Sequence, residues 1–441
     1  MQALIDRYSR FAPFCIILIL GTIGVIWPAI LNHHPFIFPD TSDYIILTPR
    51  VYRSPFYQLW VFLTGWKISL WSIIISQSLL TTWLILIFLK AESNESIFLR
   101  GIGILPIIFC SSLPIVSSFI MPDVFTGMMF LSIYLLIFKW RVLEKQKRVA
   151  IFFLSLISIS AHLSHLMMAI AISVASAVFL FVFDRHRFSA AGLIASLVSC
   201  ITCASFALIF NLVVFDETSI NPAGTTFLMA NLIAQGPARA ELKATCPEAK
   251  YRLCMYRDRL PISADDFLWG NGLLVHLGGF EKMGDESTRL VLATLAHRPL
   301  EVISASLAST ARAMLTLNPT AEITPSAPFV IDNLGLVYGS HEVSLYKNGR
   351  QEQQIFPKSL VNLLIFGGLF ISFMLIIFFG FRSKGNGLTF VSFVIVSYMG
   401  NALMCGTLSG VHDRYQSRIS WLFVLAAVAL TIGRRRRANQ T

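Results

Sequence analysis

Apolar stretches separated by short polar segments dominate the pattern of this chain. Each stretch is almost continuously apolar, which is typical of helices that cross a bilayer and differs from the one-sided pattern of helices in a soluble core. The pattern predicts an all-α polytopic membrane protein with about ten transmembrane helices, and the number between 124 and 183 is open by one helix. The stretches lie at residues 11–31, 69–89, 101–120, 124–138, 150–163, 165–183, 190–214, 358–381, 387–405 and 419–433.

The composition agrees with this class. Of 441 residues, 55% are hydrophobic and 13% are charged, whereas a soluble globular chain carries about 25% charged residues. The net charge of +11 would suggest a nucleic-acid partner for a soluble protein. Here the basic residues gather in short loops and near the C-terminus, so the expected partner is the lipid bilayer and no nucleic acid is expected.

Basic residues follow every second apolar stretch, and such residues mark the cytoplasmic side of a membrane protein. With both termini in the cytoplasm, every basic cluster falls on the same side. The C-terminus carries no retention signal for the endoplasmic reticulum, which favours a bacterial inner membrane. The basic residues are Arg7, Arg10, Lys90, Arg100, Lys139, Arg141, Lys145, Lys147, Arg148, Arg185, Arg187, Arg382, Lys384 and the run at 434–437.

This topology divides the chain into three parts. Residues 1–215 form an N-terminal transmembrane module of about seven helices, and its first exoplasmic loop spans 32–68. Residues 216–357 form a long exoplasmic loop region with amphipathic helical patterns. Residues 358–441 form a C-terminal transmembrane module of about three helices with a basic cytoplasmic tail. The stretch 50–66 mixes aromatic and polar residues and predicts a helix lying at the membrane interface.

Two cysteines of the long loop differ from the other five, which lie in or beside apolar stretches. Cys246 and Cys254 occur in CPEAKYRLC, and in an oxidising compartment they are expected to form a disulfide. The alternative, two reduced thiols in a cytosolic loop, is opposed by the charge pattern. The next segment, YRDRLPISADDFLW, is a solvated surface or a lid that faces a substrate, and its charge density favours the surface.

Five polar clusters interrupt the apolar chain, and all map to the exoplasmic side. Ionisable groups near a membrane are costly and usually face a cavity or one another. Their coincidence on one face predicts a site at the membrane–water boundary. The clusters are the first loop with Asp40, Asp43, Tyr44, Arg50, Arg53 and Tyr57; the turn with Asp123; the pair His162 and His165; the Arg, Asp and Trp residues of the long loop; and the last turn with His412, Asp413, Arg414, Tyr415 and Arg418.

Each cluster also has a purely structural explanation. Asp40 or Asp43 can cap a helix, and Asp123 can cap the helix that begins beside it. The two histidines can mark a wet helix end, and Arg414 and Arg418 can anchor a helix at the interface. The prediction of a site therefore depends on the clusters together rather than on one residue.

Four short motifs resemble the GT-C superfamily of integral-membrane glycosyltransferases. They are PDTSDY just after the first helix, Arg53-Ser-Pro-Phe-Tyr57, the acid Asp123 at the start of a helix, and Arg414-Tyr415 near the last exoplasmic turn. The resemblance implies a GT-C-like fold and transfer of a sugar from a polyprenyl-phosphate carrier to a glycan, lipid or protein acceptor. The chain has no Walker or Rossmann glycine motif, which agrees with a lipid-linked donor.

The resemblance also implies roles. Asp40 is the first choice and Asp43 the second for the general base, and Asp123 orients a sugar hydroxyl or a histidine. Arg414 and Arg418, and then Arg53, pair with the lipid phosphate. The remaining binding residues are Tyr44, Tyr57, His162, His165, His412 and Tyr415. No cofactor is assigned, although Asp40, Asp43 and His33 or His34 are residue types that could hold a divalent cation.

Three other functions stay open. A surface-polysaccharide polymerase or ligase also has many spans and a large exoplasmic loop, but it usually lacks an acid in the first loop. A transporter or flippase for lipid-linked substrates would place charges near the middle of the membrane, often in paired halves. A structural membrane subunit would not need five convergent polar clusters.

Overall fold

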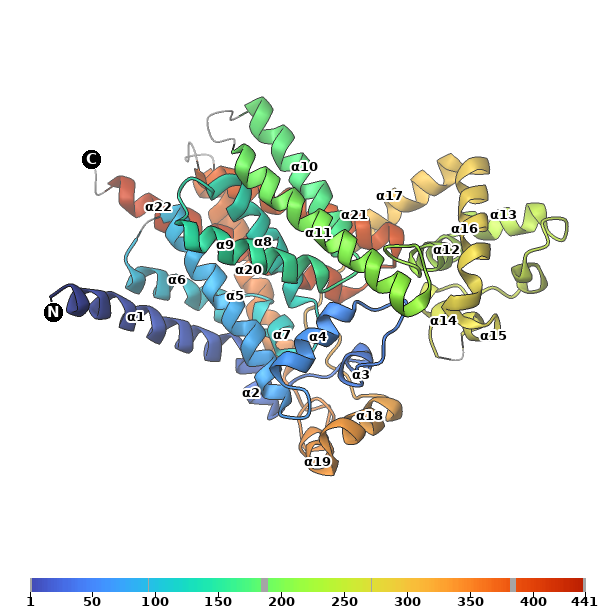
Figure 1. The fold of residues 1–441 in the computed structure, drawn as a ribbon, viewed down its shortest axis with the longest axis horizontal. Helices are drawn as coiled ribbons and strands as arrows, with labels where there is room; N and C mark the ends of the chain where they lie inside the picture. Colours follow the sequence, from blue (N-terminus) through green and yellow to red (C-terminus); the bar gives the residue numbers. More distant parts are fainter. Residues whose placement is uncertain (1, 94, 184–188, 271, 381–385, 439–441) are drawn as a thin grey trace.

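The computed structural model describes residues 2–93, 95–183, 189–270, 272–380 and 386–438 (Figure 1). Within these residues the regular structure is helical, apart from an isolated bridge between Phe36 and Phe119. The all-α class predicted from the sequence is confirmed for this part of the chain.

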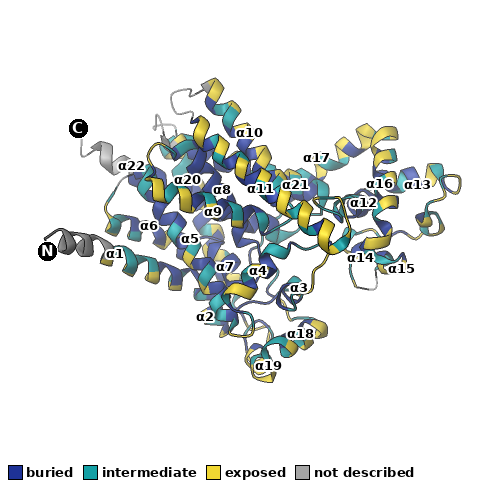
Figure 2. Cartoon of the chain, viewed as in Figure 1, coloured by how far each residue is buried: buried dark blue, intermediate teal, exposed yellow. Residues whose placement is uncertain are grey.

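A bundle of apolar helices forms the larger part of the molecule. Its central helix is α8, in which almost every residue is buried, as expected for a helix that is apolar on all sides. Helices α10 and α11 lie outside it and expose many apolar side chains (Figure 2). The bundle helices are α1 (Gln2–Val25), α5 (Leu70–Ser93), α6 (Ile97–Phe109), α7 (Leu113–Ser118), α8 (Val124–Lys139), α9 (Lys145–Ser160), α10 (His165–Phe183), α11 (Ala190–Phe215), α20 (Lys358–Gly380), α21 (Asn386–Leu408) and α22 (Asp413–Ala438).

Six helices of the described part are long and apolar enough to cross a bilayer, or seven if the bent pair α16 and α17 counts as one span. A multi-pass membrane protein is supported, but the predicted count of ten is not confirmed. The difference comes from short helices. The predicted span 101–120 is divided between α6 and α7, and the apolar part of α1 and the whole of α8 are shorter than a typical span.

The start of α1 and the end of α22 lie at one end of the longest axis, and α12 to α17 of the long loop lie toward the other end, whereas α18 and α19 lie near α2 and α3 (Figure 1). The placement of both termini in the cytoplasm stays a prediction. Arg185, Arg187, Arg382 and Lys384, which contribute to that topology prediction, lie outside the described residues.

The first loop is tied to the bundle by backbone pairing. The Phe36 N–H donates to the Ser118 carbonyl over 2.9 Å, and the Ile120 N–H donates to the Phe36 carbonyl over 3.2 Å. The Thr41 hydroxyl adds a 3.0 Å bond to the Ile120 carbonyl. These bonds fix the start of α3, where Asp40 lies. The loop helices are α2 (Trp27–Asn32), α3 (Pro39–Ile45) and α4 (Pro55–Thr64), and α4 falls inside the interval predicted for an interfacial helix.

The long loop region has two parts. The part from about 223 to 302 has its own apolar core, whereas the part from 316 to 357 packs on the first loop and the bundle core. The second part is held by Gln351, whose side-chain amide donates to the Ile37 carbonyl over 2.6 Å. The helices are α12 (Gly224–Gln235), α13 (Pro237–Thr245), the 3₁₀ helix η1 (Arg252–Tyr256), α14 (Ala264–Leu268), α15 (Leu273–His276), α16 (Gly279–His297), α17 (Pro299–Leu315), α18 (Pro328–Tyr338) and α19 (Ser340–Lys347).

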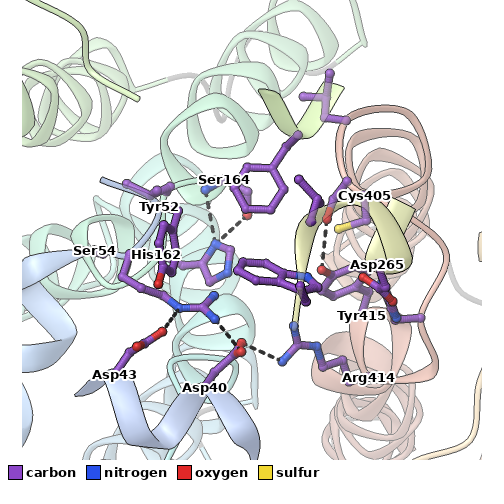
Figure 3. A pocket seen from close by; sticks show the side chains of 18 of the residues that line it. Asp40, Asp43, Tyr52, Ser54, His162, Ser164, Asp265, Cys405, Arg414 and Tyr415 are labelled. Carbon is purple, nitrogen blue, oxygen red and sulfur yellow. Dashed lines mark hydrogen bonds and ion pairs between the residues drawn. The ribbon is translucent and has the colours of Figure 1, made fainter. Parts of the chain in front are cut away.

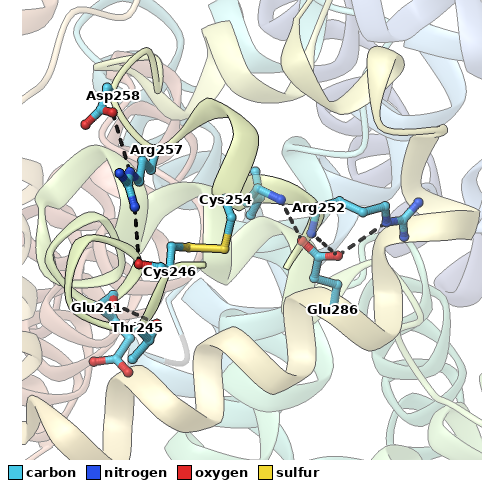
Figure 4. The surroundings of a disulfide bond; sticks show 9 residues. Glu241, Thr245, Cys246, Arg252, Cys254, Arg257, Asp258 and Glu286 are labelled. Carbon is cyan, nitrogen blue, oxygen red and sulfur yellow. Dashed lines mark hydrogen bonds and ion pairs between the residues drawn. A yellow bond between two sulfur atoms is a disulfide. The ribbon is translucent and has the colours of Figure 1, made fainter. Parts of the chain in front are cut away.

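Cys246 and Cys254 form a disulfide, which confirms the prediction (Figure 4). Glu286 of α16 supports the same turn, because its carboxylate accepts from the backbone N–H groups of Arg252 and Leu253, each over 3.0 Å. Glu286 is buried, so these bonds replace the hydration that it loses.

Removal of the disulfide by Cys254→Ser is expected to lower the stability of the 223–302 part by about 2–3 kcal/mol, the usual effect for a ring of this size. The measurement is proteolysis of the loop region against temperature, with and without a reductant. Wild-type protein under reducing conditions serves as the matched control and should behave like the variant. Equal protease resistance in all three samples would contradict the prediction.

Candidate functional site

A cavity of about 840 Å³ lies where the first loop, the bundle and the long loop region meet. The carboxylates of the first loop and the guanidinium groups of α22 line this cavity together. Figure 3 shows Asp40 bonded directly to Arg414. The predicted site residues that line the cavity are Asp40, Asp43, Tyr44, Arg53, His162, His412, Arg414, Tyr415 and Arg418.

Asp40 bridges two arginines that are far apart in the sequence. One carboxylate oxygen pairs with the Arg53 guanidinium, and the other accepts from Arg414 Nη1 over 3.2 Å. Burial raises the pKa of Asp40, but the charges of Arg53 and Arg414 outweigh it and leave that pKa below its ordinary value. Asp40 is therefore ionised and holds both arginines in place.

Arg53 connects the two acids of the first loop. Its Nε lies 3.0 Å from Asp43 Oδ2, and its guanidinium lies over the rings of Tyr52 and Trp269, with its carbon 5.3 Å and 5.4 Å from the two ring centroids. Because Arg53 is engaged by both acids, its main effect here is to fix them rather than to present an open charge.

Arg418 is fully buried at the wall of the cavity. Its Nη1 lies 3.3 Å from Asp123 Oδ1, and its Nη2 donates to Asn401 Oδ1 over 2.8 Å. Its Nε has no hydrogen-bond partner among the described residues. Asp123 makes no side-chain capping bond to α8, so the interpretation of Asp123 as a helix cap is wrong. Asp123 does not line the cavity and acts on it through Arg418.

His162 presents a neutral ring to the cavity. The backbone N–H of Ser164 donates to His162 Nδ1 over 3.2 Å, so Nδ1 is an acceptor and the ring proton lies on Nε2. Burial, followed by the charges of Arg418 and Arg414, holds the pKa of His162 well below its usual range. His162 can therefore donate one hydrogen bond from Nε2 without adding a charge.

Two other predicted binding residues do not line the cavity. The Tyr57 hydroxyl lies 3.3 Å from Gln77 Oε1, and the ring is fully buried in the bundle core. His165 is also buried, with Nδ1 2.6 Å from the Ser158 carbonyl and Nε2 2.8 Å from the Thr126 hydroxyl. Both polar groups are satisfied by neighbouring helices, so these side chains support the packing beneath the site.

The last turn contributes more than its arginines. His412 Nε2 lies 3.6 Å from Asp265 Oδ2, across the boundary between the bundle and the long loop. Burial lowers the pKa of His412, and Asp265 opposes this effect. The ring of Tyr415 lies beneath both guanidinium groups, with centroid distances of 5.2 Å to Arg414 and 5.1 Å to Arg418. The last turn thus positions the two arginines of α22 and contacts the long loop where it covers the cavity.

The long loop covers the cavity with aromatic and acidic side chains. They belong to the cluster of Arg, Asp and Trp residues that the sequence predicted for the site without specifying positions. Asp265, Leu268 and Trp269 line the cavity, so the preference for a purely solvated surface in ADDFLW is wrong. Trp269 packs edge-on against Tyr52 of the first loop at 5.5 Å. A tryptophan within a charged loop was the available signal, because a large aromatic side chain usually has a packing or binding partner.

Glu322 is a cavity residue that none of the predicted polar clusters contains. It lines the cavity in the segment after α17, and no ion pair joins it to a cation in the part of the chain that the structure describes. Burial raises the pKa of Glu322, and Arg414 only partly offsets this effect. No motif surrounds Glu322, and only the fold brings it beside Arg414.

The described residues around the cavity hold no set of side chains arranged to bind a divalent cation. Among the described residues, no group of three or more His, Cys, Asp or Glu side chains is arranged to hold a metal ion. Asp40 and Asp43 are engaged by arginines. His34 Nε2 lies 2.9 Å from Glu342, so His34 already has a partner of its own.

Comparison of this chain with protein-family models, with characterised proteins and with solved structures finds no match. The resemblance to the GT-C superfamily therefore stays a prediction.

Proposed function

We propose that this protein is a membrane glycosyltransferase that moves a sugar from a polyprenyl-phosphate carrier to an acceptor on the exoplasmic side. The observation that carries the proposal is the cavity in which acids of the first loop meet arginines of α22. A transporter would need charges along a path through the membrane, whereas these charges gather at one end of the bundle.

The reaction breaks the bond between the sugar and the phosphate and forms a bond from the sugar to an acceptor hydroxyl or amide. The electron pair of the broken bond stays on the phosphate, next to Arg414 and Arg418. Guanidinium groups suit this position because they stay charged and pair with phosphate oxygens in a fixed geometry. Their charge stabilises the developing phosphate and lowers the barrier.

The acceptor proton passes to a carboxylate of the cavity. Asp40, which the sequence favours, is a weak base in this arrangement because Arg53 and Arg414 lower its pKa. Glu322 lies in the same cavity with a raised pKa. Environments that push the pKa values of two carboxylates apart commonly separate their roles. Asp40 therefore orders the arginines in this proposal, and Glu322 accepts the proton.

Glu322→Gln is expected to reduce kcat/KM by about 100-fold, the usual contribution of a general base. In wild type the rate should fall on the acid side as Glu322 becomes protonated, and it should do so above the usual pKa of a glutamic acid because that pKa is raised. The measurement is the pH profile of kcat/KM for wild type, Glu322→Gln and Glu322→Asp. An acidic limb that persists unchanged in Glu322→Gln would assign the proton to Asp40 or Asp43.

The proposal is tested with purified protein in lipid nanodiscs and a panel of polyprenyl-phosphate sugars. The readout is release of polyprenyl phosphate in the presence of candidate acceptors. Asp258→Asn, at an exposed loop position outside the cavity, is the matched control and should retain full activity. Absence of release with every donor, from protein that stays folded, would contradict the proposal and favour the ligase or transporter functions.

The same proposal places the protein in a bacterial inner membrane with both termini in the cytoplasm and the cavity facing the periplasm. The clustering of basic residues and the position of both chain ends at one end of the molecule support this orientation (Figure 1).

A further inference from the structure

Helix α17 (Pro299–Leu315) exposes its large apolar side chains on one face. Leu300, Ile303, Leu307 and Leu315 have exposed fractions of 79%, 54%, 62% and 87%. Their spacing places them on one side of an α-helix. We call these four residues the α17 stripe. An exposed apolar strip of this kind marks a surface that meets another apolar phase.

The opposite face of α17 is made of smaller residues and packs on α21. Val302, Ser309 and Ala313 are buried there. The approach is close, since a Cβ added to Gly406 of α21 would lie 3.0 Å from the Ser309 carbonyl oxygen. A helix of a soluble domain turns its large apolar residues inward. Small residues inside and leucines outside are instead typical of helix packing in a bilayer.

The stripe lies beside a helix whose own exposed side chains are apolar. Helix α21 is long and apolar enough to cross a bilayer, and its own exposed side chains include Ile395, Val396, Met399 and Leu403. The hydroxyl of Tyr398 on α21 donates to the Met314 carbonyl over 2.9 Å, so the last turn of α17 is attached within the length of α21 rather than beyond its end.

The charges of α17 leave the stripe uninterrupted. Glu301 and Arg312 are its charged residues, and both flank the stripe near the helix ends. The chain turns by 103° between the amphipathic α16 and α17, so the axes of the two helices point in different directions. Helix α16 packs its apolar face into the core of the 223–302 part.

We propose that α17 is immersed in the leaflet next to the cavity, with the α17 stripe among lipid acyl chains and α16 in water. The occupant of this surface is the bilayer, not a protein partner. Val302 of α17 belongs to the core of the 223–302 part, whereas Gly406 lies beside Cys405 at the cavity wall. Lipid contact on α17 therefore holds the 223–302 part, which covers the cavity, at a fixed distance from the membrane. This inference does not depend on the proposed reaction.

The test places the fluorescent amino acid acridonylalanine at position 307 by codon suppression, in full-length protein in nanodiscs. Met255, an exposed apolar residue of η1 in the same part of the chain, is the matched control position at 82% exposed. Quenching is measured with lipids brominated on the acyl chains and with aqueous iodide. We expect the label at 307 to be quenched several-fold more by brominated lipid than the label at 255, and the order to reverse with iodide.

Either of two results would overturn the proposal. Strong iodide quenching at 307 would place the stripe in water. Protection at 307 from both quenchers would show that protein, either a partner or a second copy, covers it. A label at position 300, at the other end of the stripe, repeats the test if the variant at 307 does not fold.

Discussion

Asp40→Asn is expected to abolish sugar transfer, with a loss of turnover of about 100-fold or more. The change keeps the size of the side chain and removes its charge. Arg53 and Arg414 then lose the anion that they share, so Asp40 no longer holds either guanidinium group in place. The measurement is release of polyprenyl phosphate by wild type and variant under identical conditions.

The fold is expected to survive this change for two reasons. Asp43 remains paired with Arg53, and Arg414, unlike the fully buried Arg418, is 20% exposed at the cavity, where water can hydrate its charge. The melting temperatures of wild type, Asp40→Asn and the control Asp258→Asn should therefore be similar. Full turnover by Asp40→Asn would show that the carboxylate of Asp40 has no part in the reaction. Loss of both turnover and folding would leave only the structural explanation for the bridge.

The largest effect on stability is expected for Asp123→Leu. Arg418 is fully buried, and Asp123 is the acid that pairs with it. Removing one partner leaves an uncompensated charge in the bundle, which costs about 3–5 kcal/mol. The expected result is a large fall in the melting temperature measured in nanodiscs.

A double variant separates the loss of the ion pair from the loss of volume. Asp123→Leu combined with Arg418→Met removes both charges and keeps apolar bulk, so it should recover most of the stability. It should remain inactive, because Arg418 belongs to the proposed phosphate site. A double variant as unstable as Asp123→Leu alone would show that packing, and not charge, governs this position.

The polar clusters of the sequence predicted the site in outline but not in detail. Arg53 lines the cavity, yet Tyr57, four residues later in α4, is buried in the core. His162 lines the cavity, whereas His165 bonds to neighbouring helices. A sequence cluster shows only that polar groups are close along the chain, because the direction of each side chain depends on what packs against its helix.

The sequence by itself determined the features that have local causes. A continuous apolar stretch predicts a membrane helix wherever it lies, which gave the all-α membrane class. Cys246 and Cys254 close a short ring, so their pairing was predictable without the rest of the fold. The alternative of Asp40 as a helix cap is wrong in detail, because α3 begins at Pro39 and Asp40 lies inside its first turn, after the capping position at Phe38.

Only the tertiary structure decided which distant residues share one cavity. Asp40 meets Arg414 from the far end of the chain, and Glu322 and Trp269 enter from a loop without a recognisable motif. It also decided that the predicted span 101–120 breaks into two helices and that α17 turns its leucines outward. These features depend on packing between helices. The apolar pattern of each helix does not specify that packing, because an apolar side chain can face either protein or lipid.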